Sequence, residues 1–278
     1  MMQVQEDSWC SSDLSEGQFV ALGVGGGQAH AFTLQSPGKT SGNEDSVGVF
    51  PFGPGATILA VADGAGGLPA GQKASRTAIA VLRDSLMQAA DRTQLLRTAI
   101  LNGIEAANQA ILDLANGSAT TLTVASIEGR VARFYHVGDS IGLVMGQRGA
   151  LKFQTVAHSP VGFAVEAGFL SEREAMFHMD RHIVSNFMGN SEMRIDVSPE
   201  ITLAALDTVL ISSDGLSDNL QVAEVIERAR CGAGDKSLRA LVDLSLHRML
   251  GTSQMQPSKP DDLSIILFRK KPASKTPE

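Results

Sequence analysis

The spacing of apolar residues changes in blocks along the 278-residue chain, and this alternation limits the folds that the chain can adopt. Residues 57–62 (TILAVA) form a continuous apolar run that is typical of a buried strand, and the run ends at Asp63-Gly64. Apolar residues then recur at helical spacing, first at Ile79, Leu82 and Leu86 and again between residues 96 and 114. The pattern predicts a buried strand followed by two helices.

Four short stretches of alternating apolar residues follow between residues 120 and 156, and Gly-bearing turns separate them. They predict an antiparallel meander. A further strand at 208–212 ends at Asp214-Gly215, and the rest of the chain has helical patterns near 221–230 and 236–250 and a last strand at 262–268. Strand-rich regions interleaved with helix pairs indicate an α+β fold, in which two sheets pack face to face and helices cover their outer faces.

The two ends of the chain differ from the region between them. Residues 1–17 are polar and acidic and predict a flexible lead, whereas residues 270–278 (KKPASKTPE) predict a basic, solvated tail. Residues 18–269 contain no Pro/Ser-rich linker and no repeat, so we expect a single domain there.

Composition and charge bear on the partners and the location that we expect for the protein. The net charge of −7 argues against a nucleic-acid partner, and no apolar run reaches the roughly 20 residues needed to cross a membrane. The two cysteines, Cys10 and Cys231, lie far apart in sequence, which favours a reduced compartment and a cytoplasmic location.

Two glycine motifs resemble nucleotide-binding loops but lack the required context. Gly38-Lys39-Thr40 matches the end of a P-loop, yet Thr33 stands where the first glycine is needed. A strand-like segment also follows the motif, where a P-loop requires a helix whose N-terminus binds phosphate. The glycines at 23–27 lack the third glycine of a dinucleotide loop. Neither motif predicts a nucleotide site.

A third motif, Gly138-Asp139-Ser140-Ile141-Gly142, fits the nucleophile elbow of serine hydrolases. An elbow requires a helix after the serine, but the residues after Ser140 have a strand pattern. We therefore interpret the motif as a hairpin corner, and a serine hydrolase that uses Ser140 remains a distant alternative.

Aspartates recur at the ends of the expected strands. Asp63, Asp139 and Asp214 each follow a strand, and Asp261 opens the last one. One Asp-Gly pair alone is typical of a turn, but strand ends can converge on one rim of a packed sheet. Clustered carboxylates repel one another unless a cation lies between them, and sets of oxygen ligands suit Mg²⁺ or Mn²⁺. The spacing is thus compatible with a metal-assisted hydrolase.

Several motifs, in their order along the chain, resemble the metal-dependent serine/threonine protein phosphatases of type 2C, in their bacterial form. This resemblance implies a four-layer α/β/β/α sandwich of two antiparallel sheets flanked by helix pairs. Residues 158–159 and 166–170 resemble a flap beside the active site. The other motifs that carry the resemblance are Asn43-Glu44-Asp45-Ser46, residues 61–67 (VADGAGG), Ala119-Thr120-Thr121, residues 136–140 (HVGDS), residues 212–218 (SSDGLSD) and Asp261-Asp262-Leu263-Ser264.

The resemblance also implies an activity and its ligands. The expected reaction is hydrolysis of phosphoserine and phosphothreonine monoesters in proteins by a metal-activated water, and the substrate is a protein phosphorylated by a serine/threonine kinase. Two Mn²⁺ or Mg²⁺ ions are implied, together with a third, weaker one. Asp63 would bridge the two ions, and the remaining positions are the Gly64 carbonyl, Asp214 and Asp261 as ligands, Asp139 at the third site, and Glu44 and Asp45 through waters.

Two departures from the family pattern bear on substrate binding. Thr40 stands where the family places a phosphate-binding arginine, with Lys39 beside it, and Asp262 replaces an asparagine. Lys39 and Thr40 are therefore candidate phosphate contacts, but on an extended segment Lys39 would point away as an ordinary surface lysine. A weakened or inactive domain that binds phosphoproteins as a regulator is the alternative to an active phosphatase.

Overall fold

The computed structural model describes residues 9–11, 17–65, 69–91, 94–251 and 256–270. Most of the expected lead and tail, residues 1–8, 12–16 and 271–278, lies outside the described residues. Strand β1 (Trp9–Ser11) pairs with β4 (Asp45–Phe52), with Trp9 opposite Val49. This part of the expected lead is therefore an edge strand of a sheet.

Two antiparallel sheets form the centre of the molecule. The first has the order β1-β4-β5-β7-β8-β11, with β6 on β5 and β12 on β8, and the second has the order β10-β9-β13-β14-β3-β2. The remaining strands of the first sheet are β5 (Ala56–Ala65), β6 (Ala119–Thr120), β7 (Leu122–Glu128), β8 (Val131–Val137), β11 (Asp196–Val197) and β12 (Ile201–Thr202). Those of the second are β2 (Gln18–Val24), β3 (Gly27–Leu34), β9 (Ile141–Met145), β10 (Leu151–Gln154), β13 (Thr208–Ser212) and β14 (Leu263–Lys270).

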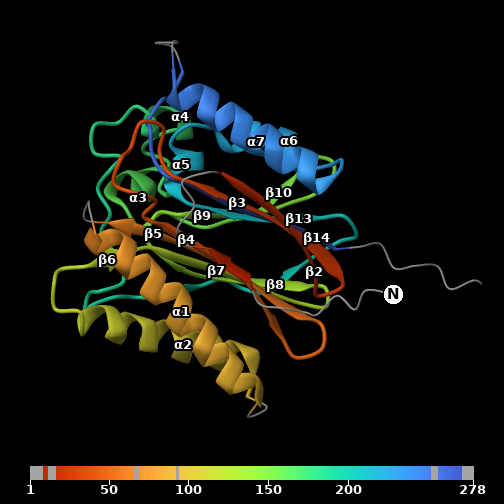
Figure 1. Cartoon of the computed structure of the whole chain (residues 1–278). Helices are drawn as coiled ribbons and strands as arrows, with labels where there is room; N and C mark the ends of the chain where they lie inside the picture. The colour runs from red at the N-terminus through yellow and green to blue at the C-terminus, as the bar shows by residue number, and fades with distance from the viewer. Residues whose placement is uncertain (1–8, 12–16, 66–68, 92–93, 252–255, 271–278) are drawn as a thin grey trace, which may run out of the picture.

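Helix pairs cover the outer faces of the two sheets, as Figure 1 shows. Helices α1 (Pro69–Asp91) and α2 (Leu96–Leu112) lie on the first sheet, and α6 (Val222–Ala229) and α7 (Gly234–Met249) lie on the second. The short helices α3 (Pro160–Glu166), α4 (Glu172–Ala175) and α5 (Asp214–Ser217) gather at one end of the sandwich. The four-layer α/β/β/α architecture expected from the sequence is confirmed.

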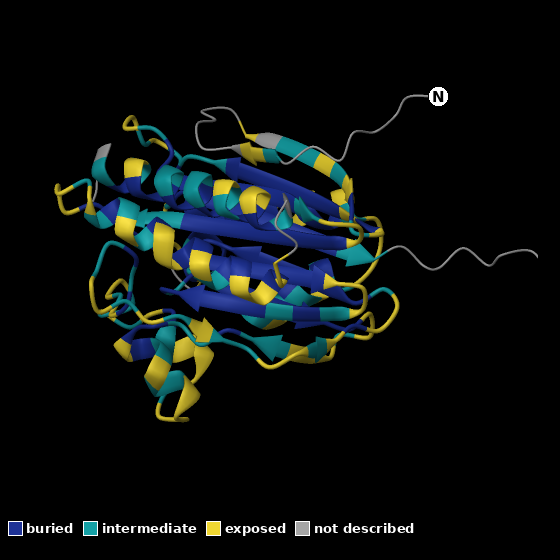
Figure 2. Ribbon diagram, turned by 90° about the horizontal axis from the view of Figure 1, so that it is seen from below, coloured by how far each residue is buried: buried dark blue, intermediate teal, exposed yellow. Residues whose placement is uncertain are grey.

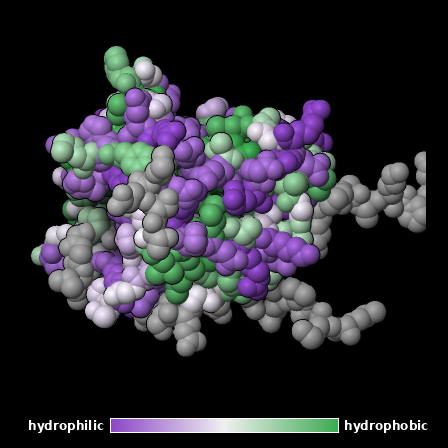
Figure 3. All heavy atoms as spheres, turned by 90° about the horizontal axis from the view of Figure 1, so that it is seen from above, coloured by the Kyte–Doolittle hydropathy of each residue, from purple (hydrophilic) through white to green (hydrophobic). Residues whose placement is uncertain are grey.

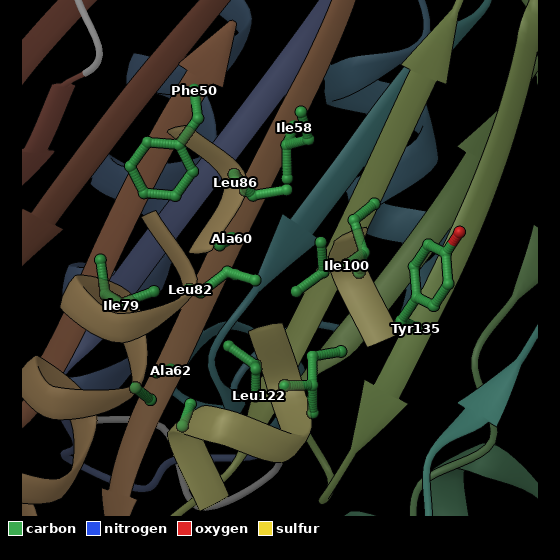
Figure 4. Close-up of a cluster of buried hydrophobic side chains, with 14 of the residues drawn as sticks. Phe50, Ile58, Ala60, Ala62, Ile79, Leu82, Leu86, Ile100, Leu122 and Tyr135 are labelled. Carbon is green, nitrogen blue, oxygen red and sulfur yellow. The ribbon is translucent and has the colours of Figure 1, made fainter. Parts of the chain in front are cut away.

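The alternation of side chains along β5 explains why the layers stack in this way. Ile58, Ala60 and Ala62 point towards α1 and α2, where they meet residues such as Leu82 and Ile100 (Figure 4). The intervening residues of β5, Leu59 and Val61, lie in the core between the two sheets. Because successive strand residues point to opposite faces, an apolar run buries both faces of a central strand. Figure 2 shows that the central strands behind the helices are buried along most of their length.

A third core lies between the second sheet and its helices. Strand residues Leu210, Ile265 and Leu267 pack there against Leu238 and Leu241 of α7. All these side chains are at most 1% exposed, so the helical pattern predicted near 236–250 marks a buried face.

The expected meander between residues 120 and 156 is wrong in one respect. Strands β7 and β8 form a hairpin in the first sheet, whereas β9 and β10 form a hairpin in the second. The chain crosses between sheets at Gly138-Asp139-Ser140, where Gly138 has a φ of +111°. A side chain at Gly138 would also approach Thr121 to 2.5 Å. The corner interpreted as a hairpin is thus a crossover that needs glycine.

Figure 3, seen from the side of α6 and α7, shows hydrophilic residues over much of this face with smaller hydrophobic groups between them. Within the described ranges, none of the helices is long and apolar enough to cross a membrane.

Candidate metal centre

Both sheets contribute carboxylates to the end of the sandwich that carries α3 and α5 (Figure 1). Asp63 lies near the end of β5, opposite Asp45 at the start of β4. Asp214, the first residue of α5, is separated from β13 only by Ser213, and Asp261 comes shortly before β14. Asp139 lies in the crossover after β8. The structure therefore brings together the strand-end aspartates that the sequence singled out.

Burial and mutual repulsion raise the pKa of these carboxyl groups. Burial contributes most to the raised pKa of Asp63, and the charges of Asp214, Asp45, Asp261 and Asp139 add to it. Burial, followed by the charges of Asp214 and Asp218, raises the pKa of Asp139 to about 8. The pKa values of Asp214 and Asp261 are also raised, with burial again the main cause. A cation bound among these groups would favour their ionised form.

The main chain around Asp63 is held by two neighbouring threonines. The Thr121 amide and the Thr120 hydroxyl both donate to the Asp63 carbonyl, each at 2.8 Å. The Asp63 amide in turn donates to Thr121 Oγ1 at 3.1 Å. These contacts hold the main chain at the end of β5, so the backbone position from which the Asp63 side chain extends is fixed.

Two glycines allow the chain to pass closely beside this point. The Gly64 amide donates to the Glu44 carbonyl at 3.2 Å. A Cβ atom at Gly64 would lie 2.3 Å from the Gly71 carbonyl oxygen, and one at Gly71 would lie 2.6 Å from Glu44 Oε1. Neither position has space for a side chain, which explains physically why both are glycine.

Glu44 and Asp45 both have carboxylate oxygens with unused acceptor capacity. Asp45 Oδ2 accepts a hydrogen bond from the Ser213 hydroxyl at 2.7 Å, and Glu44 Oε2 accepts one from Lys39 at the same distance. Glu44 Oε1 and Asp45 Oδ1 are buried, and they have no hydrogen-bond partner among the described residues. Buried acceptors usually have partners, so these oxygens fit a hard cation or its waters.

Lys259 is a member of this site that no sequence motif indicated. Its ammonium lies 2.7 Å from Asp214 Oδ2, 2.6 Å from Asp218 Oδ2 and 3.1 Å from Asp261 Oδ2. Burial alone would lower the pKa of Lys259, but the three carboxylates outweigh it and raise the pKa. Among the residues that the structure describes, no three His, Cys, Asp or Glu side chains form a ready-made ligand set for a metal ion. The lysine, two residues before Asp261, lies among the carboxylates instead.

Lys39 is paired with carboxylates on both sides. Its ammonium donates to Glu44 Oε2 and to Asp262 Oδ2, each at 2.7 Å. Lys39 therefore does not extend into solvent as the sequence alternative supposed, while Thr40 beside it is exposed. A contact of either residue with the substrate phosphate stays a prediction.

Neither the P-loop-like motif at residues 38–40 nor the elbow-like motif around Ser140 has the surroundings that its chemistry needs. Residues 38–40 lie in the connection between β3 and β4, with no helix after them. Ser140 is fully buried, and its hydroxyl pairs with the Thr121 hydroxyl at 2.8 Å, so it is not presented to a substrate. These contacts disfavour both a P-loop and a serine hydrolase.

A cavity of about 280 Å³ adjoins the acidic cluster. Asp139, Asp214 and Asp218 line one part of it, and Val161, Val165 and Met176 from the region of α3 and α4 line another. Ser159 and Glu166, from the segment that resembled a flap, line the same cavity as the aspartates.

Comparisons with known proteins agree with this geometry. The family model described as Protein phosphatase 2C matches residues 38–254. A 2C-type protein phosphatase of Streptococcus pyogenes is 32% identical over 199 residues, which cover 68% of this chain and 78% of that protein. A serine/threonine phosphatase structure from S. agalactiae superposes with a TM-score of 0.74 at 26% identity, covering 92% of this chain and all of the other. The PstP catalytic domain, solved with two manganese ions, gives a TM-score of 0.68 at 25% identity over 87% of this chain and 96% of its own length.

Proposed function

Because this chain belongs to the protein phosphatase 2C family, we propose that the acidic cluster at the end of its sandwich is its metal centre. The chain is a metal-dependent serine/threonine protein phosphatase, which hydrolyses phosphoserine and phosphothreonine monoesters. The observation that supports this location is the convergence of Asp63, Asp139, Asp214 and Asp261, whose carboxyl groups all have raised pKa values.

Each carboxylate has a distinct place in the proposed centre. Asp63 shares its surroundings with Asp214, Asp261 and Asp139, so it would hold divalent ions together with them. Asp63 would be shared between two ions, Asp214 and Asp261 would be further ligands, and Asp139 would hold a third ion more weakly. The remaining groups are the Gly64 carbonyl, as a ligand, and Glu44 and Asp45, whose unpartnered oxygens would hold waters.

Divalent ions bound there supply an acidic water for attack on phosphorus and neutralise the phosphate oxygens. The chain's own residues hold the ligands in place: Thr120 and Thr121 fix Asp63, and Ser213 orients Asp45. Both Mn²⁺ and Mg²⁺ suit the oxygen ligands, and a pair of ions has a precedent in the related PstP structure with its two manganese ions.

The substrates are phosphorylated proteins. We infer that a serine/threonine kinase supplies them, and that the enzyme acts in the cytoplasm. The comparisons do not favour the alternative of a regulator without catalytic activity, which rests on Thr40 at the position of the phosphate-binding arginine.

One assay separates the phosphatase from the regulator. A phosphothreonine peptide should be dephosphorylated with Mn²⁺ present, chelator should abolish turnover, and added Mn²⁺ should restore it. Asp63→Asn should lower kcat/KM by about 100-fold or more, because it replaces a negatively charged metal ligand by a neutral one. The metal charge that would stabilise the transition state is then held less firmly. Asp214→Asn and Asp261→Asn should act alike, and Asp139→Asn should be milder.

Thermal melting of each variant in chelator serves as the control for folding. Phosphopeptide binding without turnover at any Mn²⁺ concentration would favour the regulator. Turnover that survives chelator, or an Asp63→Asn enzyme as fast as the wild type at saturating Mn²⁺, would contradict the proposed centre.

A further inference from the structure

The ammonium of Lys259 occupies the middle of a carboxylate triangle. It donates to Asp214 Oδ2 at 2.7 Å, and it lies 2.6 Å from Asp218 and 3.1 Å from Asp261. We propose that Lys259 is a built-in competitor of the metal: it holds these carboxylates together in the metal-free protein, and a divalent ion must displace it. This inference rests on the proposed metal centre, because Asp214 and Asp261 are ligands there.

The carboxylates need a cation in the absence of metal. Asp214 and Asp218 are four residues apart across α5, so they lie on one face of the same turn, and like charges at this spacing repel. Asp261 approaches them from the chain segment before β14. Lys259 supplies the positive charge that offsets this repulsion, and its side chain is 24% exposed, so it sits at the rim of the cluster.

The backbone of Lys259 is anchored where the side chain can reach the cluster. The Lys259 amide donates to Asn219 Oδ1 at 2.9 Å, and Asn219 Nδ2 donates to the Lys259 carbonyl at the same distance. Asn219 is fully buried, and its Nδ2 also donates to the Gly215 carbonyl of α5. One side-chain amide thus ties the lysine to the helix that carries Asp214. A lysine that only happened to swing towards acidic groups would not need such an anchor.

The flexible stem of lysine allows the displacement. Four methylene groups separate the anchored backbone from the ammonium, so the charged end can leave the carboxylates while the backbone stays in place. Among the described residues no metal-ligand set is ready-made, which agrees with carboxylates that are gathered around an ammonium. When only a fraction of molecules has a free site, the apparent metal affinity falls by that fraction. Lys259 would therefore weaken metal binding at the Asp214–Asp261 side.

Direct metal titration tests the competition without any measurement of activity. Lys259→Met keeps the length of the stem and removes the charge, and Lys236→Met is the matched control, because Lys236 is exposed on α7. We expect isothermal titration calorimetry with Mn²⁺ to give a Kd about tenfold lower for Lys259→Met than for the wild type, with Lys236→Met unchanged. In chelator, Lys259→Met should melt at a lower temperature than the wild type. A lysine that merely supported the structure would lower the melting temperature without improving Mn²⁺ binding.

The wild-type protein provides a second measurement that does not depend on the folding of a variant. Acetic anhydride labelling, read by mass spectrometry, should modify Lys259 several-fold faster at saturating Mn²⁺ than in chelator, because the displaced amine leaves its carboxylate partners. Labelling of Lys236 should not change. An unchanged or higher Kd in Lys259→Met, or unchanged labelling of Lys259, would overturn the competition and leave the phosphatase assignment intact. Absence of saturable Mn²⁺ binding in the wild type, with turnover that resists chelator, would instead sink the proposed metal centre.

Discussion

Asp262 uses both carboxylate oxygens in a way that an asparagine could not. Oδ1 accepts from the Ser36 amide at 2.7 Å, while Oδ2 accepts from the Glu44 amide at 2.6 Å and from Lys39. The side-chain amide of asparagine has only one acceptor oxygen, so one of the two backbone amides would lose its partner. Asp262, a departure from the family pattern, therefore acts as a pair with Lys39, which lies beside the other departure at Thr40.

A double-mutant cycle measures this pairing. Lys39→Ala should lower the free energy of unfolding by roughly 1–3 kcal/mol, because the Asp262 carboxylate is only 3% exposed and would lose a charged partner. Asp262→Asn should also destabilise, but Lys39→Ala combined with Asp262→Asn should cost less than the sum, with a coupling of about 1–3 kcal/mol. Urea denaturation of the four proteins gives the numbers. Additive effects would mean that the pair does not interact.

The Lys39→Ala variant also tests whether Lys39 contacts the substrate phosphate. If Lys39 only orients Glu44 and Asp262, Lys39→Ala should leave KM for a phosphothreonine peptide nearly unchanged, whereas a phosphate contact predicts a rise of several-fold. Thr40→Arg should lower KM in both cases, because arginine forms the bidentate contact with phosphate that threonine cannot.

At this scale the sequence identifies the acidic residues of the site but not Lys259. The position of Asp63, Asp139 and Asp214 at strand ends is enough to single them out, since strand ends in packed sheets can share a rim. The position of Lys259 beside Asp214 depends on two segments 45 residues apart, and no local pattern contains that contact. Lysine side chains are also long enough to reach several neighbours, so sequence spacing does not identify their partners.

At the scale of elements, α1 and α2 pack closely at one glycine. Gly103 of α2 is buried, and a Cβ atom there would lie 2.9 Å from Leu82 Cδ1 and 3.3 Å from Ser85 Cβ. Gly103→Val should therefore lower the free energy of unfolding by about 1–3 kcal/mol through overpacking, although valine suits a helix better than glycine. Ala106→Val, on the exposed side of α2, should cost less than about 0.7 kcal/mol. Urea denaturation of both variants makes the comparison, and equal losses would contradict the close approach.

Periodicity identified these helices but could not assign strands to sheets. The apolar stripe from Leu96 to Ile111 is the buried face of α2, and the run from residue 57 to 62 is the centre of β5. Strands β7, β8, β9 and β10 have similar alternating patterns, yet they divide between two sheets. An alternating sequence pattern indicates which residues of a strand face a core. Because both sheets face the same core, a strand has the same pattern in either sheet. Only the glycine at the crossover signals the change.

For the whole molecule, the acidic cluster depends on the stacking of both sheets. Asp45 and Asp63 come from the first sheet, and Asp214 and Asp261 flank strands of the second. The Ser213 hydroxyl, from the second sheet, donates to Asp45 across the interface at 2.7 Å. The buried core between the sheets, which includes Val61 and Ile211, holds this register. The carboxylates therefore come together only when both sheets are stacked as they are in the folded protein.

One buried histidine should contribute a loss of stability to the whole molecule in mild acid. His136 in β8 is 2% exposed, and burial, reinforced by the charge of His158 and opposed by Asp196, lowers its pKa to about 3. The unfolded chain binds a proton near the ordinary pKa of 6.5 while the folded protein does not, so this stability is complete above pH 6.5 and is lost as the pH falls towards 3. At pH 5 the loss amounts to about 2 kcal/mol.

His136→Gln isolates this contribution, because glutamine does not titrate. In urea denaturation with chelator present, the drop in the free energy of unfolding between pH 7.5 and pH 5 should be about 2 kcal/mol smaller for His136→Gln than for the wild type. Comparing the two drops removes any pH-independent cost of the substitution. An equal drop in the two proteins would mean that His136 takes up its proton in the folded state at its ordinary pKa, and that its burial in β8 does not exclude the charge.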